Sequence, residues 1–118
     1  MDIKTELAKR LDGHPLYSQE KVESIKNHIV YAKLYSAFGR GTWHITEYSP
    51  EKGIAFGYVM DLMEDEWGYI DINELIDVRH PIGLPAIRMD AKFEPRMFHE
   101  VLAAHEPHRP IQVVVIEA

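Results

Sequence analysis

Charged side chains within stretches that alternate like β-strands are the best candidates for a binding site in this sequence. The set is Lys33, Trp43, Glu47, Tyr48, Arg88 and Asp90. Alternation would place Glu47 on one face with Trp43 and Ile45. Because a buried carboxylate without a partner is costly, we expect Glu47 to pair with Lys33 or Arg88 across a sheet. A structural ion-pair network is the favoured interpretation of this set, and the lining of a small-ligand or nucleotide pocket is the alternative.

A second group of charges is acidic and falls in one predicted turn. Its members are Asp61, Glu64, Asp65 and Glu66. Crowded carboxylates in a turn are usually a solvated loop and not a catalytic pair. They can also present spaced negative charge to a basic protein, and such binding would weaken steeply with salt.

The sequence contains no recognisable catalytic or metal-binding signature. His99, His105 and His108 are spaced by six and three residues, which matches no common ligand pattern, and cysteine is absent. The glycine-rich stretch 36–41 lacks the lysine and hydroxyl of a phosphate-binding loop, and no serine lies in a nucleophile elbow. We therefore expect no catalytic residue, no metal and no cofactor.

Length and charge narrow the class of protein. A chain of 118 residues predicts one domain spanning residues 1–118. The net charge of −6 disfavours direct binding to nucleic acid, which needs a basic surface. Asp2 and a charged amphipathic segment follow Met1, so we expect no signal peptide, no membrane span and a cytoplasmic location.

The periodicity of apolar residues predicts the elements that would position these side chains. Strands are expected at residues 28–35, 42–48, 54–62, 67–70, 86–93 and 111–116. Gly57 lies in the middle of the third of these and indicates a bulge or the close approach of a bulky neighbour, for which Trp43 is the candidate.

One helix is expected before this series of strands and two more within it. Residues 2–12 form an amphipathic pattern that Gly13 ends, and Asp71 has the form of an N-cap for a helix reaching His80. Pro95 suits the first turn of a third helix. Short hairpin connections require antiparallel neighbours, so the sequence predicts an α+β fold, with a mostly antiparallel sheet of about five to six strands and two to three helices packed on it.

Several short motifs together resemble a known family. They are AKLY at 32–35, TW at 42–43 followed by Glu47, FG at 56–57, WGY at 67–69, NEL at 73–75, GLPAIRMD at 83–90 and FEP at 93–95. In this order the chain resembles the domain of unknown function 2958, small proteins common on bacterial plasmids, integrative elements and phages. The chain departs from the family pattern where Ile87 and Met89 flank Arg88, because the family usually has an acidic residue before the arginine and an aspartate directly after it.

The resemblance implies a mobile-element origin and brings no biochemical activity with it. The function expected here is that of a non-enzymatic binding protein of a phage or mobile element, contacting a host or element-encoded protein. Inhibition of a host defence system is one form of this function that the family's setting suggests. The alternative is the small-ligand or nucleotide-binding module built on the charged set above.

Overall fold

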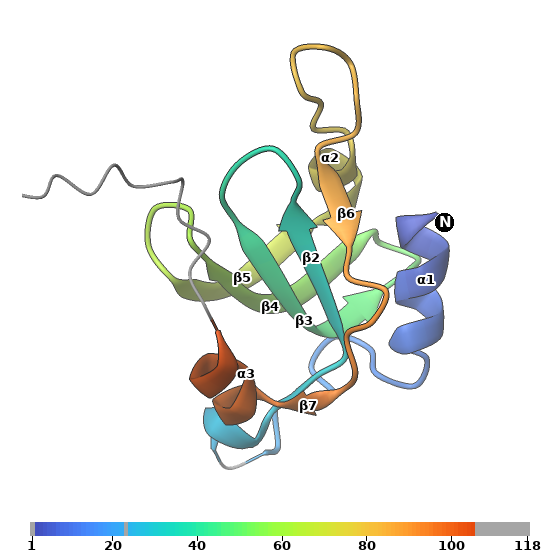
Figure 1. Ribbon diagram of the computed structural model, residues 1–118. Helices are drawn as coiled ribbons and strands as arrows, with labels where there is room; N and C mark the ends of the chain where they lie inside the picture. The colour runs from blue at the N-terminus through green and yellow to red at the C-terminus, as the bar shows by residue number, and fades with distance from the viewer. Residues whose placement is uncertain (1, 23, 106–118) are drawn as a thin grey trace, which may run out of the picture.

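A five-stranded antiparallel sheet forms the centre of the fold (Figure 1). The computed structural model describes residues 2–22 and 24–105. The strands lie in the order β5 (Glu66–Asp71), β4 (Ile54–Met60), β3 (Thr42–Ser49), β2 (Ala32–Ser36) and β6 (Ile87–Met89). A second, two-stranded sheet pairs β1 (Ile29–Val30) with β7 (Arg96–Met97).

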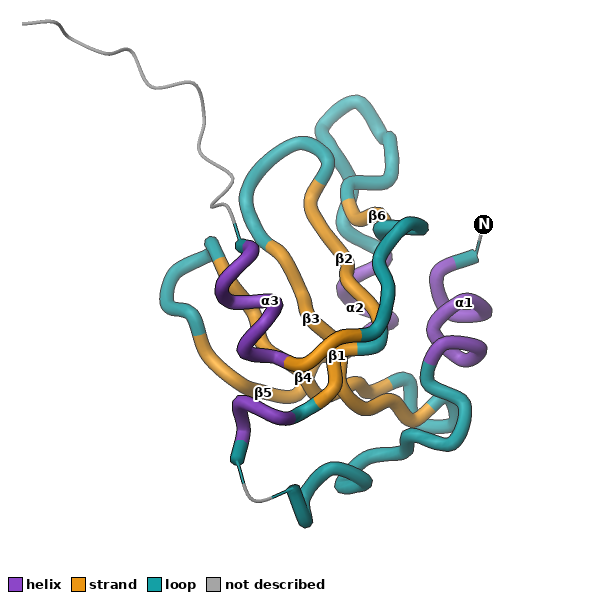
Figure 2. Tube along the Cα trace, turned by 60° about the horizontal axis from the view of Figure 1, so that its bottom comes forward, coloured by secondary structure: helices purple, strands orange, loops and turns teal. Residues whose placement is uncertain are grey.

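Helices cover both faces of the main sheet. They are α1 (Ile3–Arg10), α2 (Ile72–Ile76) and α3 (Phe98–Ala104), and a 3-10 turn spans Ile25–Asn27. Figure 2 shows α3 in front of the sheet, with α2 behind it and α1 to one side. Over the described residues the fold is α+β, as the sequence predicted.

Two separate apolar clusters hold these layers together. The larger one joins Leu7 of α1 and Ile72 of α2 to the sheet face that carries Trp43 and Ile45; this is the α1 face. The smaller one joins Phe98 and Val101 of α3 to Val30 and Met60 on the opposite side, which is the α3 face. Removing these apolar side chains from water is the main force that fixes the helices to the sheet.

A β-bulge in β3 decides which face each side chain of that strand occupies. Ile45 pairs with Gly57 and Glu47 pairs with Phe56, so Thr46 is the extra residue. The strand alternates normally as far as Ile45, and the extra residue then reverses the order of the faces. Glu47 therefore lies on the α3 face, and the prediction that it shares a face with Trp43 and Ile45 is wrong.

Gly57 is required because the backbone of β3 approaches it closely. A Cβ at this position would collide with the backbone carbonyl oxygen of His44, next to the bulge. The predicted bulge and close approach are both found, but the suggested neighbour is wrong: the ring of Trp43 instead lies against Gly41, which has a φ of +117°.

Two predicted helix starts are confirmed by their caps. The Asp2 side chain accepts a hydrogen bond from the backbone N–H of Lys4, at 3.3 Å. The Asp71 side chain accepts one from the backbone N–H of Glu74, at 3.1 Å. Each carboxylate satisfies an N–H that has no partner within the helix.

Other predicted boundaries differ because pairing between distant strands overrides the local pattern. The stretch 28–35 is split at Tyr31 between two sheets, and the second helix ends at Ile76. The expected strand 86–93 covers only Ile87–Met89. The third helix begins at Phe98 and not at Pro95, because Arg96–Met97 pair with β1. The strand predicted at 111–116 lies outside the described residues.

Candidate functional site

Glu47 is buried and is bound by backbone N–H groups instead of a cation. Its side chain is 5% exposed, and its two carboxylate oxygens accept hydrogen bonds from the backbone N–H groups of Tyr17 and Gln19, both at 2.9 Å. Neither Lys33 nor Arg88 lies within 4.0 Å of it. The predicted ion pair is therefore wrong, because the bulge turns Glu47 toward the segment before β1, where N–H groups lack other partners.

Gln19 continues this arrangement and was not predicted from the sequence. Its amide nitrogen donates to the backbone carbonyls of Ile29 and Thr46, both at 2.9 Å, and its amide oxygen accepts from the Ile29 N–H at 2.6 Å. The Gln19 side chain thus links the backbones of β1 and β3 through hydrogen bonds like those between strands. Together with Glu47 it fixes the segment 14–22 beside the sheet.

The other members of the predicted charged set do not converge. Trp43 and Tyr48 are buried in the core of the α1 face. Lys33 pairs with His44 in the sheet and, by strand alternation, lies on the α3 face. Arg88 is exposed on the edge strand β6, and the Asp90 side chain accepts a hydrogen bond from the backbone N–H of Lys92. A single pocket built from these six residues is not formed.

The acidic turn divides into two structural and two free carboxylates. Asp61 has a φ of +64° and its carboxylate lies 2.9 Å from Nε2 of His105 at the end of α3. Asp65 accepts a hydrogen bond from the backbone N–H of Asp61, at 3.0 Å. Glu64 and Glu66 are exposed and have no hydrogen-bond partner within the described part of the chain. Within the described residues, Glu64 and Glu66 therefore have both carboxylate oxygens available to a partner.

Exposed apolar side chains lie next to these carboxylates, in the turn before the edge strand β5 and on that strand. Met63 is 99% exposed, Leu62 49% and Tyr69 59%. They border a hollow of about 290 Å³ whose lining also includes Glu64 and Glu66. We call these five residues the β5-edge surface. Apolar groups exposed in such proximity are typical of interaction sites.

Tyr69 also borders a second hollow, of about 270 Å³, on the other side of the edge strand. Tyr17, which is 58% exposed, lies edge-on to Tyr69 there with 6.4 Å between ring centroids. Its lining also includes Phe56, Ile25, Glu20 and Glu47. Within the described residues β5 pairs only with β4, so its outer edge is open between these two hollows.

A third hollow, of about 220 Å³, has the opposite charge. It lies between the sheet, the segment 90–96 and α3, and three cations line it: Lys33, Lys92 and Arg96. His44 and His105 are also part of the lining. We call this cavity the basic hollow. The sequence had suggested only Lys33, Asp90 and His105 of this lining as possible site residues. The others could not be found, because β2, the segment 90–96 and α3 meet only in the folded chain.

His44 is the least solvated titratable group of the basic hollow. Its side chain is 1% exposed, its Nε2 lies 3.2 Å from the Thr42 hydroxyl, and its Nδ1 has no partner among the described residues. Burial, followed by the positive charges of Lys33 and His105, lowers the pKa of His44 from 6.5 to about 3. The imidazole is therefore neutral at pH 7 and carries a single N–H.

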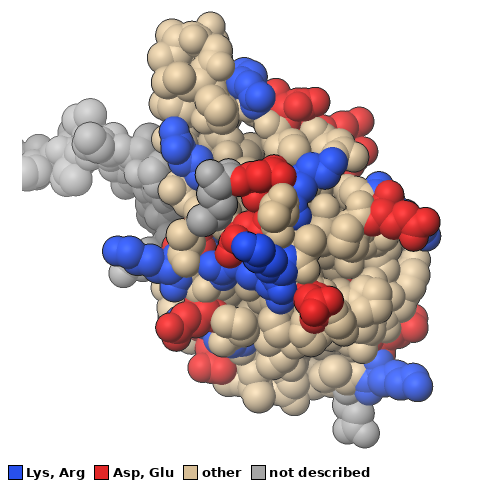
Figure 3. Space-filling view, turned by 90° about the vertical axis from the view of Figure 1, so that its right-hand side faces the viewer, with Lys and Arg blue, Asp and Glu red and all other residues tan. Residues whose placement is uncertain are grey.

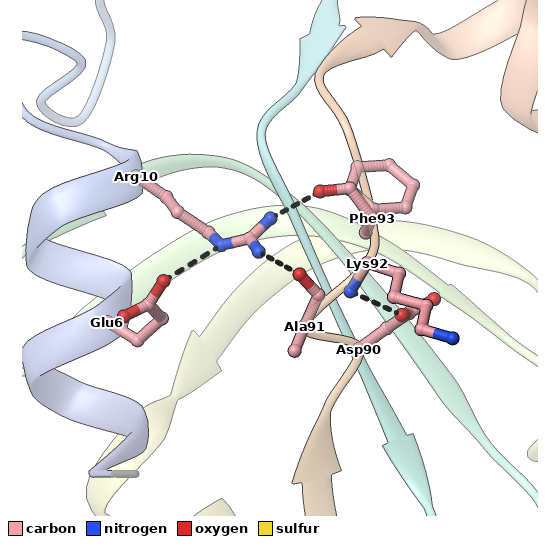
Figure 4. A network of polar contacts seen from close by, with 6 residues as sticks. All are labelled: Glu6, Arg10, Asp90, Ala91, Lys92 and Phe93. Atoms are coloured by element: carbon pink, nitrogen blue, oxygen red, sulfur yellow. Dashed lines mark hydrogen bonds and ion pairs between the residues drawn. The ribbon is translucent and has the colours of Figure 1, made fainter.

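Arg10 of α1 fixes the segment that supplies two of the cations. Its guanidinium donates to the backbone carbonyls of Phe93 at 2.6 Å and Ala91 at 2.9 Å, and it lies 3.4 Å from Glu6 (Figure 4). These contacts tie α1 to residues more than 80 positions away in the sequence. Figure 4 also shows the hydrogen bond from the Lys92 backbone nitrogen to Asp90, and no contact is marked from the Lys92 ammonium.

The described residues, 2–22 and 24–105, offer no candidate for a metal centre or a membrane span. No group of three or more histidine, aspartate or glutamate side chains in this part of the chain is placed to hold a metal ion. No helix there combines the length and apolar character needed to cross a membrane.

The fold and these surfaces define the class of protein: a small α+β domain whose antiparallel sheet is covered on both faces by helices and has β5 and β6 as its edge strands. Residues 3–106 match the family described as Protein of unknown function (DUF2958), so the chain belongs to this family, as its motifs suggested. No curated protein and no solved structure matches the chain with significant similarity.

Proposed function

We propose that this chain is a non-enzymatic binding protein of a phage or other mobile element, and that it contacts a host or element-encoded protein in the cytoplasm. The proposal assigns it no catalytic step and no cofactor. The mobile-element setting, and inhibition of a host defence system as one form of the function, come from the family's usual setting and not from a particular residue.

The observation that carries this proposal is the β5-edge surface. A side chain as apolar as Met63 would not normally remain 99% exposed beside Leu62 and Tyr69 unless a partner covers it. Tyrosine and methionine are also enriched in protein interfaces, where they supply apolar contact area.

The chemistry of this surface indicates the chemistry of its partner. Glu64 and Glu66 are exposed and unpaired among the described residues, so a basic segment would complement them. The open edge of β5 offers backbone N–H and C=O groups to an extended chain, and Gly68 in the middle of the strand leaves open space where a side chain would stand. The proposed partner is therefore an extended, basic protein segment with at least one apolar side chain.

Two features support a protein partner over nucleic acid. The net charge is −6. On the side of the molecule drawn in Figure 3, basic and acidic side chains are interspersed, without the continuous basic stripe that a phosphate backbone requires.

The small-ligand alternative built on Lys33, Trp43, Glu47 and Arg88 loses its basis, since these side chains lie on both faces of the sheet.

Site-specific photocrosslinking tests the proposal directly. A photoreactive phenylalanine analogue replaces Met63 in one version of the protein and the exposed Lys9 of α1 in a control version, and both are irradiated in host cells. We expect one protein to be crosslinked reproducibly from position 63 and not from position 9. The same crosslinks from both positions, or none from position 63, would contradict the proposal.

The role of charge is then tested with the purified crosslinked protein. Glu64→Lys with Glu66→Lys should weaken its binding by about tenfold or more at low ionic strength, and less at high salt. The matched control is Asp12→Lys with Glu51→Lys, which makes the same change in net charge at exposed positions elsewhere. Equal loss of affinity in both double variants would exclude a specific role for the β5-edge surface.

A further inference from the structure

The basic hollow concentrates positive charge that the described residues do not balance. Lys33, Lys92 and Arg96 line it, and no carboxylate in the described part of the chain lies within 4.0 Å of any of them. Asp90 is the one carboxylate in the lining, and one of its oxygens accepts the Lys92 backbone N–H at 3.0 Å. Because the chain as a whole has a net charge of −6, this local excess does not follow from composition.

A second, independent observation at this hollow is the unpartnered nitrogen of His44. The side chain is almost fully buried, lines the hollow and leaves its Nδ1 without a hydrogen bond among the described residues. If Nε2 accepts the hydroxyl proton of Thr42, Nδ1 carries the single N–H of the neutral ring. Buried donors in folded proteins are nearly always hydrogen-bonded, so this N–H calls for an acceptor that the described residues do not supply.

We propose that the basic hollow binds the phosphate group of a small phosphorylated molecule. A phosphate dianion balances the charge of three cations better than a ligand with a single carboxylate would. A lysine acts on phosphate as a point charge, and the planar guanidinium of Arg96 can donate two parallel hydrogen bonds to it. The volume of about 220 Å³ holds a phosphate with a small organic group and is smaller than a typical drug-sized pocket.

The fold places the three cations on supports that are independently fixed. Lys33 lies on the central sheet opposite His44. Arg96 lies in β7, where Val30 of β1 is its pairing partner. Arg10 holds the backbone on either side of Lys92 through the carbonyls of Ala91 and Phe93 (Figure 4). Preorganised charges of this kind reduce the cost of ordering side chains when an anion binds.

The phosphate site shares no lining residue with the β5-edge surface. The two proposals can therefore be tested independently. It also differs from the charged pocket expected from the sequence, since Trp43, Glu47 and Arg88 are not part of its lining.

Titration with inorganic phosphate at constant ionic strength tests the proposal. The protein is labelled with ¹⁵N, and the imidazole signals of His44 are followed by NMR at neutral pH. We expect saturable shifts with a dissociation constant in the range of about 0.1–10 mM. Lys33→Gln and Arg96→Gln should each weaken binding by about tenfold, since each removes a charge-assisted contact.

Arg88→Gln is the matched control, because it removes an exposed cation of the sheet outside the hollow. It should leave the dissociation constant within about twofold of the original value. Arg96 is exposed, so Arg96→Gln should fold normally. It therefore tests the site even if Lys33→Gln does not fold.

Three results would overturn the proposal. One is the absence of saturable shifts at His44, and another is equal weakening by Arg96→Gln and Arg88→Gln. The third concerns the ligand: sulfate binding as tightly as phosphate, or a single-stranded oligonucleotide binding more tightly per phosphate group, would refute the assignment to a small phosphorylated molecule.

Discussion

Replacing Glu47 tests whether backbone N–H groups, and not cations, stabilise this buried carboxylate. Each hydrogen bond to a charged group contributes about 1.5–3 kcal/mol. Glu47→Gln keeps one acceptor oxygen and loses the other, together with the charge, so we expect a loss of about 2 kcal/mol. Glu47→Ala leaves the N–H groups of Tyr17 and Gln19 without both oxygens. The first of these bonds is only partly buried, so water can replace it, and we therefore expect a loss of about 3 kcal/mol.

Urea denaturation and thermal melting measure these losses. For a chain of 118 residues the unfolding entropy converts 1 kcal/mol into about 4 °C, so Glu47→Gln should lower the Tm by about 8 °C and Glu47→Ala by about 12 °C. Hydrogen exchange should rise most at the Tyr17 and Gln19 amides, because local opening of their segment becomes easier.

The controls are Lys33→Gln and Arg88→Gln, which remove the cations that the sequence suggested as partners. Each should change the free energy of unfolding by less than about 0.5 kcal/mol near pH 7.5. Our reasoning would be refuted if either control cost as much as Glu47→Gln, or if Glu47→Gln left the stability unchanged.

Substitutions at Gly57, His44 and Asp61 test other parts of the structure. Gly57→Ala should destabilise the fold by about 2 kcal/mol or more through collision with the β3 backbone, whereas Gly68→Ala, which adds a methyl group in open space, should cost less than about 1 kcal/mol in urea denaturation. Because the pKa of His44 is depressed to about 3, the unfolded chain binds a proton below pH 6.5 that the folded chain does not. Stability should therefore fall by about 1.4 kcal/mol per pH unit as the pH decreases from 6.5 toward 3; this component should be missing in His44→Phe, and an imidazole titrating near pH 6.5 in NMR would contradict it. Asp61→Asn weakens the 2.9 Å contact with His105 and should cost about 1 kcal/mol, seen as faster hydrogen exchange in α3, and unchanged exchange there would show that the contact does not hold the helix.

The features that sequence predicted well depend on neighbours in the chain. Side-chain alternation located β2, β3 and β4, because the two faces of a strand differ in burial and a strand repeats every two residues. The cap at Asp71 was readable because a capping carboxylate and the N–H it accepts are three residues apart. The motif order indicated the family, which the match over residues 3–106 establishes.

The candidate sites could not be predicted in the same way. Gly57 signalled a bulge, but not that the extra residue would lie in the partner strand at Thr46 and turn Glu47 to the other face. Gln19 has no local pattern, since its partners Ile29 and Thr46 are 10 and 27 residues away.

The sequence by itself determined the class of fold, the main strands and the cap at Asp71, because hydrophobic periodicity and capping act over a few residues. Tertiary structure alone decided which charges meet. A single extra residue in β3 moved Glu47 away from Trp43, and pairing of β1 with β7 brought Arg96 toward Lys33 and His44. Coulomb interactions and hydrogen bonds depend on distance in space, and that distance is set by the register between strands that are far apart in the chain.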